Sequence, residues 1–110
     1  MAIVWIVDDE PFYFRGHVGD LEDRGYGVIL FGSPREAIEE LNCGMKFDYA
    51  VVDLSQPHPG GDYLIEYMRQ KHPKGRIIAM SGYYVGRVKG ADCVLHKPFG
   101  VRDLLRKMGK

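Results

Sequence analysis

The sequence predicts an α/β domain in which helices cover both faces of a parallel sheet. Five short apolar runs alternate with amphipathic stretches, and most of the runs are continuously apolar. A strand has such a run when both faces of its sheet are covered, as in parallel sheets. A chain of 110 residues suits one compact core, so we expect a single domain over residues 1–110.

The candidate strands are the five apolar runs, at residues 2–7, 28–31, 49–54, 76–81 and 93–96. The stretches between and after them predict helices. Ser33 can cap one helix, Pro34 suits its first turn, and Glu36 completes a capping box. The helices are expected at residues 11–24, from 34 to about 42–44, at 62–71 and at 101–108.

The connection between the fourth and fifth runs is too short for a full helix. Only the eleven residues GYYVGRVKGAD separate Ser81 from Cys93, whereas a parallel crossover needs roughly a dozen or more. Gly82, Gly86 and Gly90 disfavour a helix further. We therefore predict that the fourth helix is absent or cut to about one turn.

The polar residues that follow the strands predict where the chemistry lies. In an open parallel sheet, binding groups collect beyond the carboxyl ends of the strands. We expect the flavodoxin-like, doubly wound order 2-1-3-4-5, in which the first and third strands are neighbours. Asp8, Asp9 and Asp53 would then converge, with Ser81 and Lys97 approaching from the far side.

Three carboxylates in one small site repel each other, by about 3 kcal/mol per pair at ~5 Å and an effective dielectric of ~20. A hard divalent cation relieves this repulsion best, Mg²⁺ before others. Asp53 is then a candidate nucleophile towards phosphorus. Lys97 and Ser81 are candidates for binding the oxygens of the transferred phosphoryl group.

Four motifs resemble the receiver domain of bacterial response regulators, in the same order and along nearly the whole chain. VDDEP at 7–11 is similar to the family's acidic pocket, and DLSQP at 53–57, followed by Gly61, to its phosphoacceptor segment. MSG at 80–82 resembles its hydroxyl-bearing strand, and HKPF at 96–99 its lysine-proline segment. The four motifs together are far more specific than each alone.

The resemblance implies that Asp53 accepts a phosphoryl group in the presence of Mg²⁺. Asp8 and Asp9 would hold the metal with Asp53, Asp9 being favoured as a direct ligand, and the backbone carbonyl of Ser55 would be a further ligand. The domain would then be a switch that phosphorylates and dephosphorylates itself, rather than a metabolic enzyme.

The resemblance also implies roles around Lys97. Ser81 and Lys97 would bind the phosphoryl group, and the Lys97–Pro98 peptide bond would be cis. The phosphodonor would be a phosphohistidine on a sensor histidine kinase or a phosphotransfer protein, and the output would act on a partner protein that the sequence does not identify.

The sequence departs from the family pattern at the switch. The family often has an aromatic residue three positions before the lysine, where this chain has Val94. Together with the short fourth crossover, this predicts an altered output surface, for which Tyr83 or Tyr84 is a candidate substitute ring. Ser55 and Tyr83 occupy positions at which the family tunes dephosphorylation.

Three other functions are alternatives for this sequence. A binding module that signals without phosphorylation is supported by the shortened crossover and opposed by the intact acidic site. An aspartyl phosphatase usually has a second Asp two residues after the nucleophile, where this chain has Ser55. A flavin-binding protein needs backbone N–H groups and small residues to cradle phosphate in its first loop, where DDEP presents negative charge.

Composition bears on partners and location. The net charge is zero, with 15 basic and 15 acidic residues, so we expect no nucleic-acid binding by this domain. No apolar stretch reaches 18 residues, and MAIVWIVDDE is not a signal peptide, so we expect no membrane span and a cytoplasmic protein. We expect reduced cysteines, with Cys93 buried in its strand. No metal-type spacing links the histidines, which are His17, His58, His72 and His96.

Overall fold

The computed structural model describes residues 1–55, 60–83 and 85–109. His58, Tyr84 and the last two residues of the DLSQP motif lie outside the described residues. Five parallel strands form one sheet in the order β2-β1-β3-β4-β5, as the sequence predicted. The strands are β1 (Ile3–Val7), β2 (Gly27–Phe31), β3 (Tyr49–Asp53), β4 (Arg76–Ser81) and β5 (Cys93–His96).

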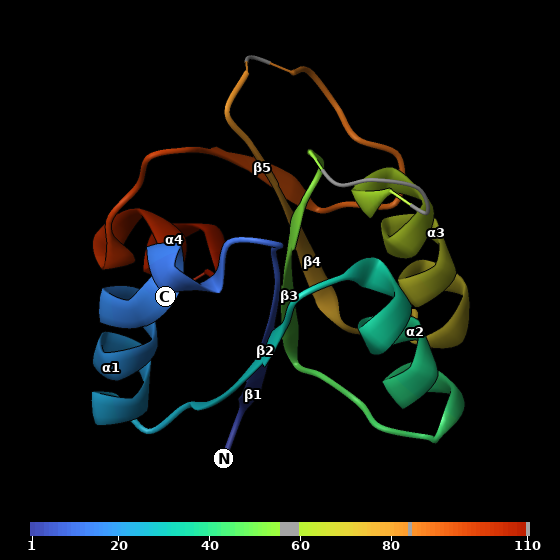
Figure 1. The fold of residues 1–110 in the computed structure, drawn as a ribbon, viewed down its shortest axis with the longest axis horizontal. Coiled ribbons are helices and arrows are strands. Elements are labelled where there is room, and N and C mark those ends of the chain that lie inside the picture. The colour runs from blue at the N-terminus through green and yellow to red at the C-terminus, as the bar shows by residue number, and fades with distance from the viewer. Residues whose placement is uncertain (56–59, 84, 110) are drawn as a thin grey trace.

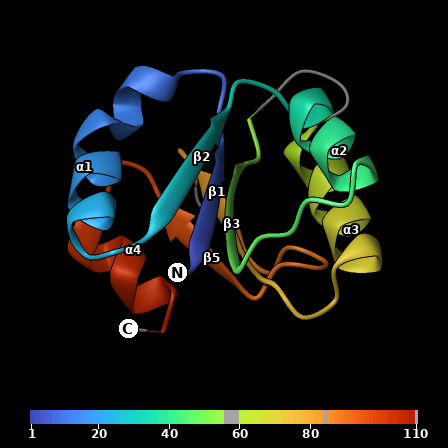
Figure 2. The same cartoon turned by 90° about the horizontal axis from the view of Figure 1, so that it is seen from below.

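Helices cover both faces of the sheet, as Figure 1 and the view from below in Figure 2 show. Helices α1 and α4 lie on one face, and α2 and α3 lie side by side on the other. The helical elements are the 3-10 helix η1 (Pro11–Phe14), α1 (Arg15–Asp23), α2 (Pro34–Asn42), α3 (Gly61–Lys71) and α4 (Val101–Lys107).

The helix starts follow the local sequence. Ser33 caps α2, because its Oγ accepts a hydrogen bond from the backbone N–H of Glu36 at 3.3 Å. The first helical segment differs from the expected single helix, since the 3-10 turn of η1 precedes α1. Such turns are frequent at helix N-termini, where the first N–H groups have no intrahelical partner.

Two hydrophobic cores lie on the two faces of the sheet, because successive residues of a strand point to opposite faces. Val51 joins the core beneath α1 and α4, and its neighbour Val52 joins the core beneath α2 and α3. Trp5 is fully buried in the latter, with its ring centroid 4.8 Å from that of Phe31 and 5.3 Å from that of Phe47. Burial on both faces explains why the strand sequences are continuously apolar.

The fourth crossover contains no helix in its described residues, which are 82–83 and 85–92. The prediction of a shortened or absent fourth helix is therefore confirmed. Figure 1 shows this segment (orange) as an open loop on the α3 side of the sheet. Cys93 is only half-buried, not buried as expected; its side chain faces the core beneath α1 and α4, where Sγ lies 3.7 Å from the carbonyl oxygen of Lys107.

Arg69 of α3 attaches the loop that stands where a crossover helix would otherwise lie. Its guanidinium donates to the carbonyl oxygen of Gly90 at 2.9 Å and to Asp92 Oδ2 at 2.8 Å. The same side chain also donates to the carbonyl oxygens of Pro73 and Gly75. One fork therefore links α3 to the segments on both sides of β4. None of the described helices has the length and apolar character needed to cross a membrane.

Candidate phosphoryl-transfer site

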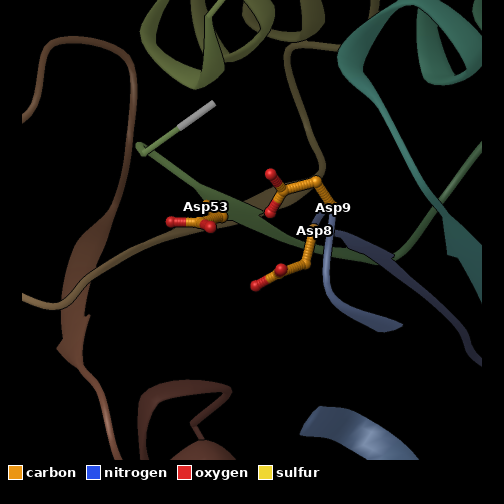
Figure 3. Close-up of side chains that lie close together, drawn as sticks. All are labelled: Asp8, Asp9 and Asp53. Atoms are coloured by element: carbon orange, nitrogen blue, oxygen red, sulfur yellow. The ribbon is translucent and has the colours of Figure 1, made fainter. Parts of the chain in front are cut away.

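The carboxyl ends of β1 and β3 bring three carboxylates together. Strands β1 and β3 are paired in register, with Val7 opposite Val52, so Asp8 and Asp53 follow at adjacent positions of the same edge. One oxygen each of Asp8, Asp9 and Asp53 lies within 4.8 Å of the others. Figure 3 shows these side chains close together at the ends of the two strands.

The two inner carboxylates are buried and held by backbone groups. Asp8 is 1% exposed and Asp53 is 3% exposed. The Oδ1 atom of Asp8 accepts from the backbone N–H of Glu10 at 2.7 Å, and that of Asp53 accepts from the N–H of Ser55 at 3.0 Å. Each bond reaches two residues ahead, an Asx-turn geometry that fixes the side chain relative to its own strand end.

Lys97 lies between these two carboxylates. Its Nζ atom is 2.5 Å from Asp8 Oδ2 and 3.3 Å from Asp53 Oδ2. Burial alone would lower the pKa of Lys97, but the hydrogen bonds and negative charges of Asp8 and Asp53 outweigh it and leave the pKa raised. Lys97 is therefore a cation at neutral pH.

The charges of the site do not balance. Asp8, Asp9 and Asp53 carry three negative charges in their ionised forms, and Lys97 supplies one positive charge. Asp9 is exposed, so its carboxylate is accessible from solvent. Close oxygen ligands with excess negative charge suit a hard divalent cation, and the donor set of this site fits such an ion.

The lysine segment is joined to the neighbouring strand. The backbone N–H of Lys97 donates to the carbonyl oxygen of Ser81 at 2.9 Å, just beyond the pairing of Ser81 with His96. The Lys97–Pro98 bond is cis, as the resemblance implied. The position of the end of β5 therefore places the Lys97 ammonium next to the carboxylates of Asp8 and Asp53.

Ser81 is the last residue of β4 and is 2% exposed. Since Met80 is opposite Asp53, Ser81 lies one position beyond the carboxylate on the adjacent strand. Its Oγ accepts from the backbone N–H of Tyr83 at 3.0 Å, which leaves the hydroxyl hydrogen able to donate. Ser55 meets Asp53 through its backbone N–H, while the predicted role of its carbonyl oxygen stays a prediction.

Gly61 explains how closely α3 approaches the site. A Cβ atom built on Gly61 would lie 2.1 Å from the backbone oxygen of Asp53 and 3.0 Å from the Cα of Leu54. Only glycine fits there without moving the backbone that carries Asp53.

Two aromatic residues next to Lys97 were missed by the sequence reasoning. The Nζ atom lies 5.1 Å from the ring centroid of Tyr13 and 5.8 Å from that of Phe14. Aromatic faces at this distance attract a cation. The signal was the aromatic run FYF directly after the VDDEP motif; its rings come close to the site because η1 turns the chain.

Comparison with known proteins assigns the class. The profile of the response regulator receiver domain family matches residues 4–108, so the chain belongs to this family. Members of the family act as signalling switches in two-component systems, in which they interact with histidine kinases or phosphotransfer proteins.

Relatives and solved structures agree with this assignment. The chain is 34% identical to part of the sensor kinase CckA of Brucella abortus, over 94% of this chain and 12% of that protein. It is similar to a CheY-like receiver domain protein from Methanospirillum hungatei, with a TM-score of 0.88, 27% identity, and coverage of 99% of this chain and 91% of that one.

A third similarity is to a Burkholderia pseudomallei response regulator that was solved with a phosphorylated aspartic acid, a calcium ion and citrate. The TM-score is 0.87 and the identity 27%, over 98% of this chain and 66% of that one. The chain spans between 12% and 58% of the length of seven curated relatives that it matches. Activities of those whole proteins do not transfer to it directly.

Proposed function

We propose that Asp53 accepts a phosphoryl group from a phosphohistidine of a sensor kinase or phosphotransfer protein, and that this switches a protein-interaction surface. The observation that carries the proposal is the buried Asp53 carboxylate at 3.3 Å from the Lys97 ammonium, beside two further carboxylates. In this proposal, residues 1–110 are one receiver domain and not a metabolic enzyme.

In the proposed step, a carboxylate oxygen of Asp53 attacks the phosphorus atom of the donor. A P–O bond forms, the P–N bond breaks, and the leaving imidazole keeps the electron pair and takes a proton from water. Lys97 offsets charge on the transferring oxygens, and the Ser81 hydroxyl donates to another of them. Attack of water on phosphorus later restores the Asp53 carboxylate.

The proposed metal is Mg²⁺, held by Asp8, Asp9, Asp53 and the backbone carbonyl of Ser55. When bound, it would neutralise negative charge on the transferring phosphoryl group. The convergence of three carboxylates, two of which pair with the Lys97 ammonium, supports the proposal. The phosphorylated aspartic acid and calcium ion of the similar Burkholderia pseudomallei protein add support, since that protein has the same fold.

Phosphorylation can be tested by intact mass spectrometry after incubation with acetyl phosphate and Mg²⁺. We expect the wild-type protein to gain one phosphoryl group and Asp53→Asn to gain none, because an amide is not a competent nucleophile. Chelation of the metal should prevent the gain in the wild type. A wild-type protein that gains no phosphoryl group from either acetyl phosphate or a phosphorylated phosphotransfer protein would contradict the proposal.

A second candidate is a receiver-like module that binds its partner without phosphorylation. The observations in its favour are the loop at residues 82–92, in which no described residue is helical, and Val94 at the position where the family often has an aromatic ring. It predicts equal partner affinity for the wild type and Asp53→Asn, with or without a phosphodonor. The cytoplasmic location and the lack of nucleic-acid binding remain predictions under both functions.

A further inference from the structure

Two side chains of the first helical segment hold the backbone of Phe99, one by its N–H and one by its carbonyl oxygen. The hydroxyl oxygen of Tyr13 accepts a hydrogen bond from the backbone N–H of Phe99 at 2.9 Å. The Nε2 atom of His17 lies 2.7 Å from the carbonyl oxygen of Phe99. Because a carbonyl oxygen only accepts, Nε2 is the protonated ring nitrogen in this contact.

The contact is built into the packing of η1 and α1. The rings of Tyr13 and His17 are stacked, with centroids 5.5 Å apart, and both meet the Phe99 ring edge-on at 5.8 and 5.1 Å. Phe99 is 8% exposed. In the described part of the chain, Nδ1 of His17 is buried without a partner, so the bond from Nε2 is the polar contact that orients the ring.

Phe99 lies two residues after Lys97. The backbone N–H of Lys97 is bonded to the carbonyl oxygen of Ser81, so the segment is tied to β4 before Pro98 and to α1 after it. The Tyr13 ring also lies 5.1 Å from the Lys97 ammonium. A lysine side chain has four flexible methylene groups, so the place of its ammonium depends on how firmly its backbone and neighbours are held.

We propose that Tyr13 and His17 are positioning residues that clamp the segment 97–99 and so hold the Lys97 ammonium where it meets the transferring phosphoryl group. This inference rests on the proposed phosphorylation of Asp53. It assigns to η1 and α1 a part in phosphoryl transfer, which they exert through the backbone of Phe99. Misplacing a charge-stabilising group by about 1 Å can slow a reaction by up to roughly 100-fold.

The first test measures phosphoryl uptake from acetyl phosphate in the full chain. Tyr13→Phe removes one clamp bond but keeps the ring near Lys97, and His17→Leu removes the other bond. Each should lower the rate at saturating Mg²⁺ by roughly 10-fold, while the Mg²⁺ concentration for half-maximal rate stays unchanged. His17→Gln keeps an N–H donor and should restore most of the rate.

The chain offers matched controls away from the site. His72 makes the same kind of contact, from Nε2 to the carbonyl oxygen of Phe47 at 2.7 Å, and Tyr67 donates its hydroxyl to Asn42. His72→Leu and Tyr67→Phe should lose a comparable bond without slowing phosphoryl uptake. Equal slowing by the control variants, or no slowing by Tyr13→Phe and His17→Leu, would overturn the clamp.

The second test does not depend on phosphorylation. The Lys97 side chain lies close to two aromatic rings, so we expect the NMR shifts of its ε-methylene protons to differ from those of free lysine. In His17→Leu these shifts should move towards the free value, and in His72→Leu they should not move. Unchanged shifts would refute the clamp, whereas absent phosphoryl uptake in the wild type would refute only the proposed function.

Discussion

Two consecutive crossovers of the same sheet are built in different ways. Between β3 and β4, helix α3 (Gly61–Lys71) packs on the sheet and buries Leu64, Ile65 and Met68. Between β4 and β5, no described residue is helical, and the loop is fastened to α3 by the Arg69 fork. The first crossover is held against the sheet by the hydrophobic face of its helix. The second is held by hydrogen bonds and by a few half-buried apolar residues.

The difference shows what the candidate site requires. Ser81, before the irregular loop, is 2% exposed, and Lys97, after it and β5, still reaches Asp8 at 2.5 Å. The pairing of β4 with β5 is kept, because Asp92 accepts from the backbone N–H of Ile77 at 2.7 Å and from Arg69. The site therefore depends on the register of the strand ends, and a crossover can lose its helix without dispersing it.

The largest effect is expected from truncating the helix face of the first crossover. Leu64→Ala should lower the free energy of unfolding by about 2–5 kcal/mol, because Leu64 is fully buried and leaves a cavity. Val88→Ala, in the loop, should lower it by about 1 kcal/mol or less, because Val88 is only half-buried. Urea denaturation measures both. Similar losses of unfolding free energy in the two variants would mean that the loop stabilises the hydrophobic core as much as α3 does.

A smaller difference in stability is expected between alanine substitutions of a glycine in each crossover, Gly61 and Gly86. Gly61→Ala should destabilise by about 1–3 kcal/mol and slow phosphoryl uptake, because the new methyl group would lie 2.1 Å from the backbone oxygen of Asp53. Gly86→Ala meets nothing within 4 Å and should stabilise by about 0.4–1 kcal/mol through the unfolded state. If Gly61→Ala changed neither stability nor phosphoryl uptake, α3 would be able to move away from Asp53 at no cost, contrary to this account.

The Arg69 fork should matter less for stability than Leu64 or Gly61, since its ion pair is partly exposed. Arg69→Met should cost about 1–2 kcal/mol and speed proteolysis of the loop, while phosphoryl uptake persists. Lys89→Met is the matched control, because the Lys89–Glu66 pair lies at 3.3 Å with the lysine 90% exposed, and it should change stability by less than about 0.5 kcal/mol. Equal proteolysis in both variants would contradict the role of Arg69.

The smallest effect concerns the pH dependence of stability that arises from Cys93, the half-buried first residue of β5. Burial raises the pKa of the Cys93 thiol above its ordinary value of 9.0, against the opposing charges of Arg76 and Lys107. A raised folded pKa gives stability that is complete below pH 9.0 and is lost as pH rises through the folded value. Cys93→Ala should lose less stability than the wild type above pH 9, as measured by urea denaturation at several pH values. Identical pH profiles of the two proteins would exclude this contribution.

Much of the fold follows from local sequence. The bounds of β4 and β5 match the apolar runs, and the Ser33 cap follows from the pattern Ser-Pro-x-Glu, since strand patterns and caps depend on near neighbours. The convergence of Asp8, Asp53 and Lys97 follows from strand order, because polar residues at the carboxyl ends of neighbouring parallel strands must meet.

What could not be predicted depends on contacts between distant residues. No local pattern indicates that Arg69 donates to Gly90 and Asp92, 21 and 23 residues further along the chain. Likewise, His17 contacts Phe99 across 82 residues, so its sequence neighbours say nothing of the clamp. Cys93 was expected to be buried because it lies in a strand, but its exposure depends on how α4, which follows β5, packs against the sheet, since its Sγ lies 3.7 Å from the carbonyl oxygen of Lys107.

The central claim, that Asp53 is the phosphoacceptor, is tested most directly by locating the phosphoryl group. Borohydride reduces an aspartyl phosphate to homoserine, so the treated residue can be identified by peptide mass spectrometry after incubation with acetyl phosphate and Mg²⁺. We predict homoserine at position 53 alone. Homoserine at position 8 or 9, or unmodified Asp53 in protein that carries a phosphoryl group, would contradict the account.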